Sequence, residues 1–150
     1  MQILDPVINA VLTEFCSRFT PSGRVLWVDE GGEEAAYKSL DAWGSLGLPS
    51  SPRPDLPNIV IYDEGRHWLI LIDVARIRGQ MNSKRYAILR QMFQGCALSL
   101  VFVNVFKDRS ELGDWLLDFP WHTAAWFAEE PDHMIHFNGV QFLAPYQKMQ

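Results

Sequence analysis

Apolar residues near the N-terminus recur at the spacing of one helical face. Within the stretch DPVINAVLTEFCSRF they are Ile8, Val11, Leu12, Phe15 and Phe19. Asp5 can cap the first turn of such a helix, and Pro6 suits its first position because a proline there gives up no hydrogen bond. The pattern predicts a helix that ends at the TPSG turn, residues 20–23.

Short apolar segments bounded by turn residues follow along the rest of the chain. Those expected as strands are RVLWVD (24–29), NIVIYD (58–63), HWLILIDV (67–74), ALSLVFVNVF (97–106), TAAWFAE (123–129) and MIHFNGVQFL (134–143). The second and third flank the turn EGR and so predict a hairpin. The last contains Asn138 and Gly139, a pair typical of a hairpin turn.

Three further segments carry helical signals: GEEAAYKSLDAWGSLG (32–47), NSKRYAILRQMFQG (82–95) and DRSELGDWLLDFP (108–120). Asn82 is the expected cap of the second helix and Gly95 its end. The proline-rich stretch LPSSPRPDLP, residues 48–57, is expected as a surface loop. Helices and strands in this order predict an α/β fold with a mixed central sheet flanked by helices.

Composition and charge narrow the class of protein. The chain has 150 residues, 48% of them hydrophobic, with six Trp and nine Phe, which predicts a single domain over residues 1–150 with a well-filled core. No apolar run could cross a bilayer, and the N-terminus lacks a basic flank, so we expect a cytoplasmic protein. Cys16 and Cys96 are expected to be reduced and buried. The net charge of −5 argues against strong, independent DNA binding but leaves room for a local basic patch.

Candidate chemistry gathers at one end of the central hairpin. Asp73 follows the apolar run of the second hairpin strand, and the next helix begins with Lys84 and Arg85. Strands that carry carboxylates beside a lysine suit Mg²⁺-assisted phosphodiester hydrolysis. The metal activates a water molecule, and the lysine stabilises the negative charge that develops on the phosphate in the transition state. Asn58 stands where such a site would need a second carboxylate. The ordinary alternative for a lone strand-end Asp is a turn or cap contact.

The segment LPNIVIYDEGRHWLILIDVARIRGQMNSKR, residues 56–85, resembles the catalytic segment of the BsuBI/PstI family of type II restriction endonucleases, a branch of the PD-(D/E)XK nucleases. The likeness continues through FKDR, PDHMIHFNG and FLAPY and covers roughly residues 24–146. It implies a PD-(D/E)XK core, Mg²⁺ as cofactor, double-stranded DNA as partner and a role in restriction or phage defence. It also implies that the family's N-terminal recognition region is absent here, so that a partner protein, a separate recognition subunit or a homodimer would complete DNA recognition.

The family's site residues can be carried over position by position. Its first metal-binding Asp falls on Asn58, and its second acid, a Glu, falls on the shorter Asp73. The resemblance thus implies Asn58, Asp73 and Lys84 as catalytic residues, with Asp73 and Asn58 at the metal. Because an amide carries no charge, Mg²⁺ binding would be weak or absent. The usual superfamily position for the lysine holds Ala75, so Lys84 would supply the amine from the helix.

Basic residues cluster in the same region: Arg76, Arg78, Lys84, Arg85 and Arg90 lie within fifteen positions. One interpretation is a phosphate-facing patch in which Arg76, Arg78 and Arg85 bind DNA beside a helix N-terminus. The other interpretation is a solvated loop and helix start.

Other candidates for a metal ligand are weaker. Asp55 lies three residues before Asn58, which would turn its side chain to the other face of a strand, and Asp63 lies at the strand's far end. His133 and His136 would point to opposite faces of an extended chain, so we do not expect them to share a metal.

Two functions remain open. Asp73 and the retained Lys84 and Arg85 favour a DNA endonuclease, with activity reduced or lost. Asn58 and the net charge of −5 favour a catalytically inactive nuclease-fold module that binds DNA or a partner protein.

Overall fold

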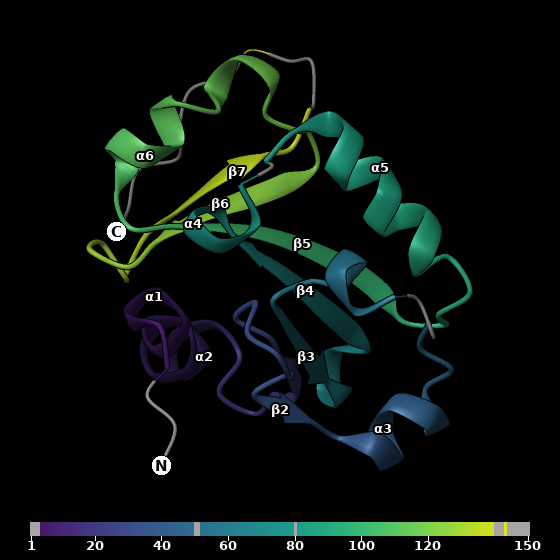
Figure 1. The fold of residues 1–150 in the computed structure, drawn as a ribbon. Helices are drawn as coiled ribbons and strands as arrows, with labels where there is room; N and C mark the ends of the chain where they lie inside the picture. Colours follow the sequence, from purple (N-terminus) through teal and green to yellow (C-terminus); the bar gives the residue numbers. More distant parts are fainter. Residues whose placement is uncertain (1–3, 50–51, 80, 140–142, 144–150) are drawn as a thin grey trace, which may run out of the picture.

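The computed structural model describes residues 4–49, 52–79, 81–139 and 143 (Figure 1). Their strands form one seven-stranded sheet in the order β2-β1-β3-β4-β5-β6-β7. The strands are β1 (Arg24–Val28), β2 (Tyr37–Lys38), β3 (Ile59–Asp63), β4 (Trp68–Val74), β5 (Ser99–Phe106), β6 (Thr123–Phe127) and β7 (Met134–Phe137).

The sheet is mixed, as the sequence predicts. Strands β1, β3 and β4 pair antiparallel, β4, β5 and β6 pair parallel, and β7 returns antiparallel to β6. The parallel pairs need crossovers, which helices between the strands provide. The predicted α/β class and the central hairpin of β3 and β4 are therefore confirmed.

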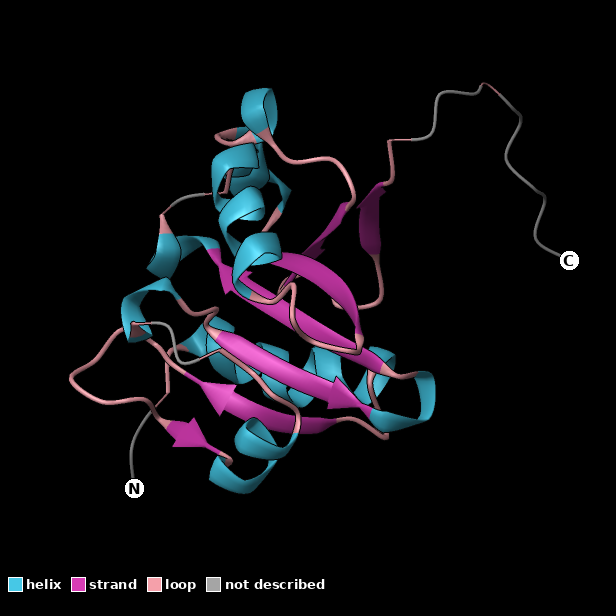
Figure 2. Ribbon diagram, turned by 90° about the vertical axis from the view of Figure 1, so that its right-hand side faces the viewer, coloured by secondary structure: helices cyan, strands magenta, loops and turns pink. Residues whose placement is uncertain are grey.

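Helices cover both faces of the sheet, as Figure 2 shows in a view turned by 90°. They are α1 (Pro6–Ala10), α2 (Cys16–Phe19), α3 (Leu40–Ser45), α4 (Ala75–Arg78), α5 (Ser83–Met92) and α6 (Arg109–Gly113). A π-helical turn, Val11–Phe15, joins α1 to α2, and three short 3-10 turns cover Arg53–Asp55, Glu64–Arg66 and Leu116–Asp118. The side chain of Asp5 accepts hydrogen bonds from backbone N–H groups in the first turn of α1, and the side chain of Asn82 does the same for α5. Both expected caps are therefore confirmed.

Alternate residues of β3 and β4 pack into two different hydrophobic clusters. Ile59, Ile61, Ile70 and Ile72 pack with the N-terminal helical segment, whereas Val60, Leu69 and Leu71 pack with α3 and α5. This alternation follows from the two-residue period of a strand. Because β3 and β4 are covered on both faces, they are apolar at nearly every position, which is why their sequences read as continuous hydrophobic runs.

Two sequence expectations need correction. The helix expected over 32–47 is wrong in its first half: Tyr37–Lys38 form β2, which pairs with β1, and only Leu40–Ser45 are helical. Pairing with β1 supplies backbone hydrogen bonds that outweigh the local helical signal. The helix expected over 108–120 divides into α6 and a 3-10 turn, with Gly113 at the break.

The terminal hairpin is tested only in part. Its first arm is β7, and Gly139 has the positive φ expected at the turn. Residues 140–142 of the second arm lie outside the described residues. Within the described part of the chain, no helix has the length and apolar character needed to cross a membrane.

Candidate active site

Four neighbouring strands bring a polar residue to the same edge of the sheet. Val28 pairs with Ile59, and Ile59 pairs with Ile72. Continuing these antiparallel registers by one residue places Asp29 opposite Asn58, and Asn58 opposite Asp73. Asp73 itself pairs with Asn104 of β5. We call Asp29, Asn58, Asp73 and Asn104 the strand-end row; all four are buried.

Asn58 is a bridge between two strands. Its side-chain Nδ2 donates to the backbone O of Asp29 at 2.9 Å, and its Oδ1 accepts from the backbone N of Val74 at 2.8 Å. The residue is 3% exposed. These bonds use both ends of the amide and satisfy backbone groups at the ends of β1 and β4. An ionised carboxylate at this position could accept from Val74 but could not donate to Asp29, whereas the amide does both.

Asp73 is held by an arginine. Arg85 Nε donates to Asp73 Oδ2 at 2.8 Å and its Nη2 donates to Oδ1 at 3.2 Å, which makes a bidentate pair. Both side chains are almost fully buried, at 5% exposed for Arg85 and 2% for Asp73. A second guanidinium approaches from α4, with Arg78 Nε at 3.8 Å from Asp73 Oδ1. Each carboxylate oxygen of Asp73 thus already accepts from a cation.

Asp29 is a site residue that sequence reasoning missed. Its oxygens accept from Arg53 Nε and Nη2, each at 2.8 Å, and Oδ1 also accepts from the backbone N of Gly31. Burial raises the pKa of the Asp29 carboxyl, but the hydrogen bonds from Arg53 and Gly31 outweigh that effect, and the pKa lies below its ordinary value. A signal existed in the sequence, since Asp29 follows an apolar strand just as Asp73 does.

The lowered pKa of Asp29 predicts a contribution to acid sensitivity. A carboxyl whose pKa is lower in the folded state stabilises the fold above its unfolded pKa, and this stabilisation disappears as pH falls through the folded pKa. Asp29→Asn is expected to lower the free energy of unfolding by about 1–2 kcal/mol at neutral pH. The difference from the wild-type protein should shrink progressively below about pH 4.

Urea unfolding midpoints across the acid range measure this effect. Asp41→Asn, on the exposed first turn of α3, is the control. It should leave the loss of stability at acid pH as it is in the wild-type protein. A destabilisation by Asp29→Asn that stays constant down to the lowest pH would contradict the assignment.

Three arginines also connect the proline-rich loop to the strand-end row through hydrogen bonds. Arg78 donates to the backbone O of Pro54 at 2.5 Å and to that of Leu56. Arg85 donates through Nη1 to the backbone O of Asp55 at 2.8 Å. Arg53, in the loop itself, binds Asp29. Residues 52–57 of the expected loop are therefore fixed by hydrogen bonds and contain the 3-10 turn Arg53–Asp55.

The remaining basic residues differ in their exposure. Lys84 lies in the first turn of α5 with its side chain in solvent, and within the described residues it makes no ion pair to Asp73. Arg76 is half-exposed and lies 3.3 Å from Asp5 Oδ2. Arg78 and Arg85 point inward to protein acceptors. Of Arg76, Arg78, Arg85 and the neighbouring Lys84, only Arg76 and Lys84 therefore offer exposed side chains. The DNA-binding role expected for Arg76, Arg78 and Arg85 and the catalytic role expected for Lys84 stay predictions.

The other sequence candidates lie apart from this arrangement. Asp63 pairs with Trp68 at the opposite end of the hairpin and accepts from Arg66. Asp55 is exposed on the 3-10 turn, where the strand alternation expected for it does not apply. His133 is exposed in the turn before β7 and His136 lies within that strand.

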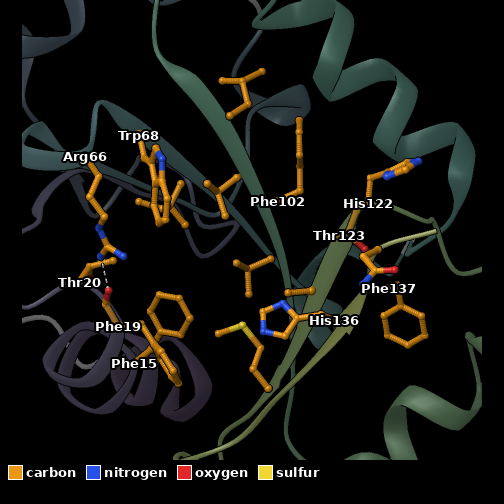
Figure 3. A pocket seen from close by; sticks show the side chains of 17 residues that line it. Phe15, Phe19, Thr20, Arg66, Trp68, Phe102, His122, Thr123, His136 and Phe137 are labelled. Atoms are coloured by element: carbon orange, nitrogen blue, oxygen red, sulfur yellow. Dashed lines mark hydrogen bonds between the residues drawn. The ribbon is translucent and has the colours of Figure 1, made fainter. Parts of the chain in front are cut away.

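A larger cavity lies elsewhere. It has a volume of about 510 Å³ and adjoins the N-terminal helical segment and strands β4 to β7. Figure 3 shows Phe15, Trp68 and Phe137 around it, together with His122 and His136. Such size and apolar lining are typical of ligand pockets. However, none of its described lining residues is a carboxylate, so we place the candidate chemistry at the strand-end row.

The donors of the strand-end row do not fit a Mg²⁺ ion. Mg²⁺ needs free oxygens in octahedral geometry and keeps several waters. Asn58 Oδ1 and the oxygens of Asp73 and Asp29 already accept hydrogen bonds from protein. The cavity beside Asp73 measures about 10 Å³, no more than one water needs. Among the described residues, no group of three His, Cys, Asp or Glu side chains could hold a metal.

Comparison with known proteins identifies the family. The type II restriction enzyme BsuBI of Bacillus subtilis is 35% identical over 141 residues, covering 94% of this chain and 45% of that protein. The type II restriction enzyme AplI of Arthrospira platensis is 33% identical over 144 residues, covering 91% and 44%. The structure of the SdaI restriction endonuclease matches with a TM-score of 0.83 and 34% identity, over 95% of this chain and 45% of that one.

The chain thus spans a little less than half the length of these relatives. The family model for the BsuBI/PstI restriction endonuclease domain matches residues 4–140, nearly the whole of this sequence. The likeness inferred from the hairpin and the PDHMIHFNG segment is confirmed: the chain belongs to the BsuBI/PstI restriction endonuclease family.

Proposed function

We propose that this domain acts on double-stranded DNA as a restriction-endonuclease domain in which phosphodiester hydrolysis is slow or lost. The observation that carries the proposal is the commitment of the Asn58 amide to Asp29 and Val74 at the position of the family's first acid. With Asp73 bound to Arg85 and Asp29 bound to Arg53, the described strand-end row offers a catalytic cation no carboxylate without a guanidinium partner. Family membership supports DNA as the substrate class.

A restriction or phage-defence role follows from the same kinship. More than half of each matched relative lies outside the region of similarity. We therefore infer that recognition of a DNA sequence uses more protein surface than this domain offers. We propose a recognition subunit, another partner protein or a second copy of the chain as partners of the domain on DNA.

We assign DNA contact to the exposed cations next to the strand-end row. Lys84 is exposed in the first turn of α5, and Arg76 is half-exposed on α4. Each phosphate contact releases counterions, so the DNA affinity of such a surface falls steeply with salt. Arg78 and Arg85 would contribute positive potential from inside the protein and not direct contacts.

Replacing both exposed cations should weaken DNA binding without unfolding the protein. A plot of log affinity against log salt has a negative slope, to which each phosphate contact contributes roughly 0.9. The double variant Lys84→Ala/Arg76→Ala is therefore expected to make this slope less steep by about 2. Fluorescence anisotropy with a duplex at several salt concentrations measures this slope. The control Arg18→Ala/Arg90→Ala removes two charges from α2 and the far end of α5 and should leave the slope nearly unchanged.

The same samples test hydrolysis. Supercoiled plasmid incubated with wild-type protein in Mg²⁺ or Mn²⁺ should remain largely supercoiled while the anisotropy assay reports binding. Equal salt slopes for the two double variants would overturn the assignment of the DNA surface. Rapid linearisation by the wild-type protein would overturn the loss of hydrolysis.

A second candidate is a working endonuclease, and one feature favours it. The resemblance places Asp73 at the position of the family's second acid. The side chain of Lys84 is solvent-exposed and can therefore change its rotamer toward a bound phosphate. In that case Lys84→Ala would abolish cleavage while leaving most of the DNA affinity in place.

A further inference from the structure

Arg85 compensates the charge of Asp73 and donates a hydrogen bond to each of its carboxylate oxygens. The two side chains share two hydrogen bonds, of 2.8 and 3.2 Å, and neither is more than 5% exposed. The remaining Nη1 donates to the backbone O of Asp55, so each nitrogen of the guanidinium has an acceptor. Such a pair is costly to break from one side, because the partner is left as an uncompensated buried charge.

The buried carboxylates of the strand-end row are compensated without an added ion. Asp29 pairs with Arg53, and Asp73 pairs with Arg85 and lies 3.8 Å from Arg78. Two carboxylates thus face three guanidinium groups, so −2 and +3 sum to +1. A divalent cation entering this cluster would find no excess negative charge to attract it.

We propose that Arg85 is the permanent counter-ion of Asp73, a positioning residue that holds the strand-end row and the proline-rich loop in place without any divalent cation. The guanidinium provides the charge compensation that a metal would otherwise give to this acid. The inference concerns the same site as the proposed function and rests on the loss of the metal there. Its test reads thermal stability, whereas the proposed function is tested with DNA, so either can fail alone.

The test is a double-mutant cycle followed by thermal unfolding. Arg85→Met keeps the length of the side chain but removes its charge, and should lower Tm by about 10 °C. Asp73→Asn in the same protein removes the stranded carboxylate, so the double variant should recover a large part of that loss. Arg90→Met is the matched control on the exposed face of α5 and should shift Tm by no more than about 2 °C.

Metal provides the second arm of the test. The Tm of the wild-type protein should be the same in EDTA and in millimolar Mg²⁺, whereas Mg²⁺ or Mn²⁺ should raise the Tm of Arg85→Met by partly replacing the lost charge. If Arg85→Met does not fold, a folded double variant supports the proposal and an unfolded one overturns it. A wild-type Tm that rises with Mg²⁺, or an Arg85→Met variant no less stable than Arg90→Met, also overturns it.

Discussion

Asn58→Asp is expected to destabilise this domain by about 2–4 kcal/mol at neutral pH and to leave its affinity for divalent cations weak. The substitution introduces the acid that the resemblance to the family implies for this position. Here, however, the Asn58 amide donates to the backbone O of Asp29 across 2.9 Å. A carboxylate would bring one oxygen against that carbonyl oxygen and would add a negative charge in a buried position.

The destabilisation should depend on pH in a defined direction. Burial and the nearby Asp29 and Asp73 would raise the pKa of a carboxyl introduced at position 58 above its unfolded value. When protonated, that carboxyl can donate to Asp29 as the amide does. The variant should therefore approach wild-type stability below about pH 4, and the deficit should grow as pH rises through the raised folded pKa.

Denaturant unfolding of Asn58→Asp at several pH values provides the measurement. Asn104→Asp is the control: it makes the same chemical change at another buried position of the strand-end row. Within the described residues Asn104 has no side-chain bond of the kind that Asn58 makes to two strands, so its variant reports the added charge alone. If Asn58→Asp is as stable as the wild-type protein near neutral pH and gains tight Mg²⁺ binding, the bridging role of Asn58 is refuted.

The central hairpin could be predicted because its signals are local. The runs that form β3 and β4 are apolar at nearly every position, and the turn between them carries a glycine. The position of Asp73 after the second run then follows from the chain itself. Likewise, Asp5 and Asn82 cap helices through contacts two or three residues away, which sequence spacing records.

The partners within the site could not be predicted in the same way. Arg85 and Lys84 are neighbours of similar charge, yet Arg85 is buried against Asp73 while Lys84 is exposed. Only the rotation of α5 against the sheet decides which of the two points inward, and a single sequence does not contain that rotation. Asp29 and Arg53 meet across 24 residues, and their contact depends on how the proline-rich loop returns to the sheet.

Divalent cations are expected to bind the wild-type protein with a dissociation constant in the millimolar range or weaker, orders of magnitude above that of a site with two free carboxylates. The reason is structural as well as chemical. Asp73 would have to leave Arg85, and Asn58 would have to release Val74. The ion would also need more space than the cavity of about 10 Å³ beside Asp73 and Arg85 provides.

Calorimetric titration of the wild-type protein with Mg²⁺ and Mn²⁺ measures this affinity, with Asp73→Asn titrated in parallel. We expect no saturable binding in the micromolar range and indistinguishable heats for the two proteins. Micromolar binding of Mg²⁺ by the wild-type protein, abolished in a folded Asp73→Asn variant, would contradict this expectation and would show that the strand-end row is a metal site.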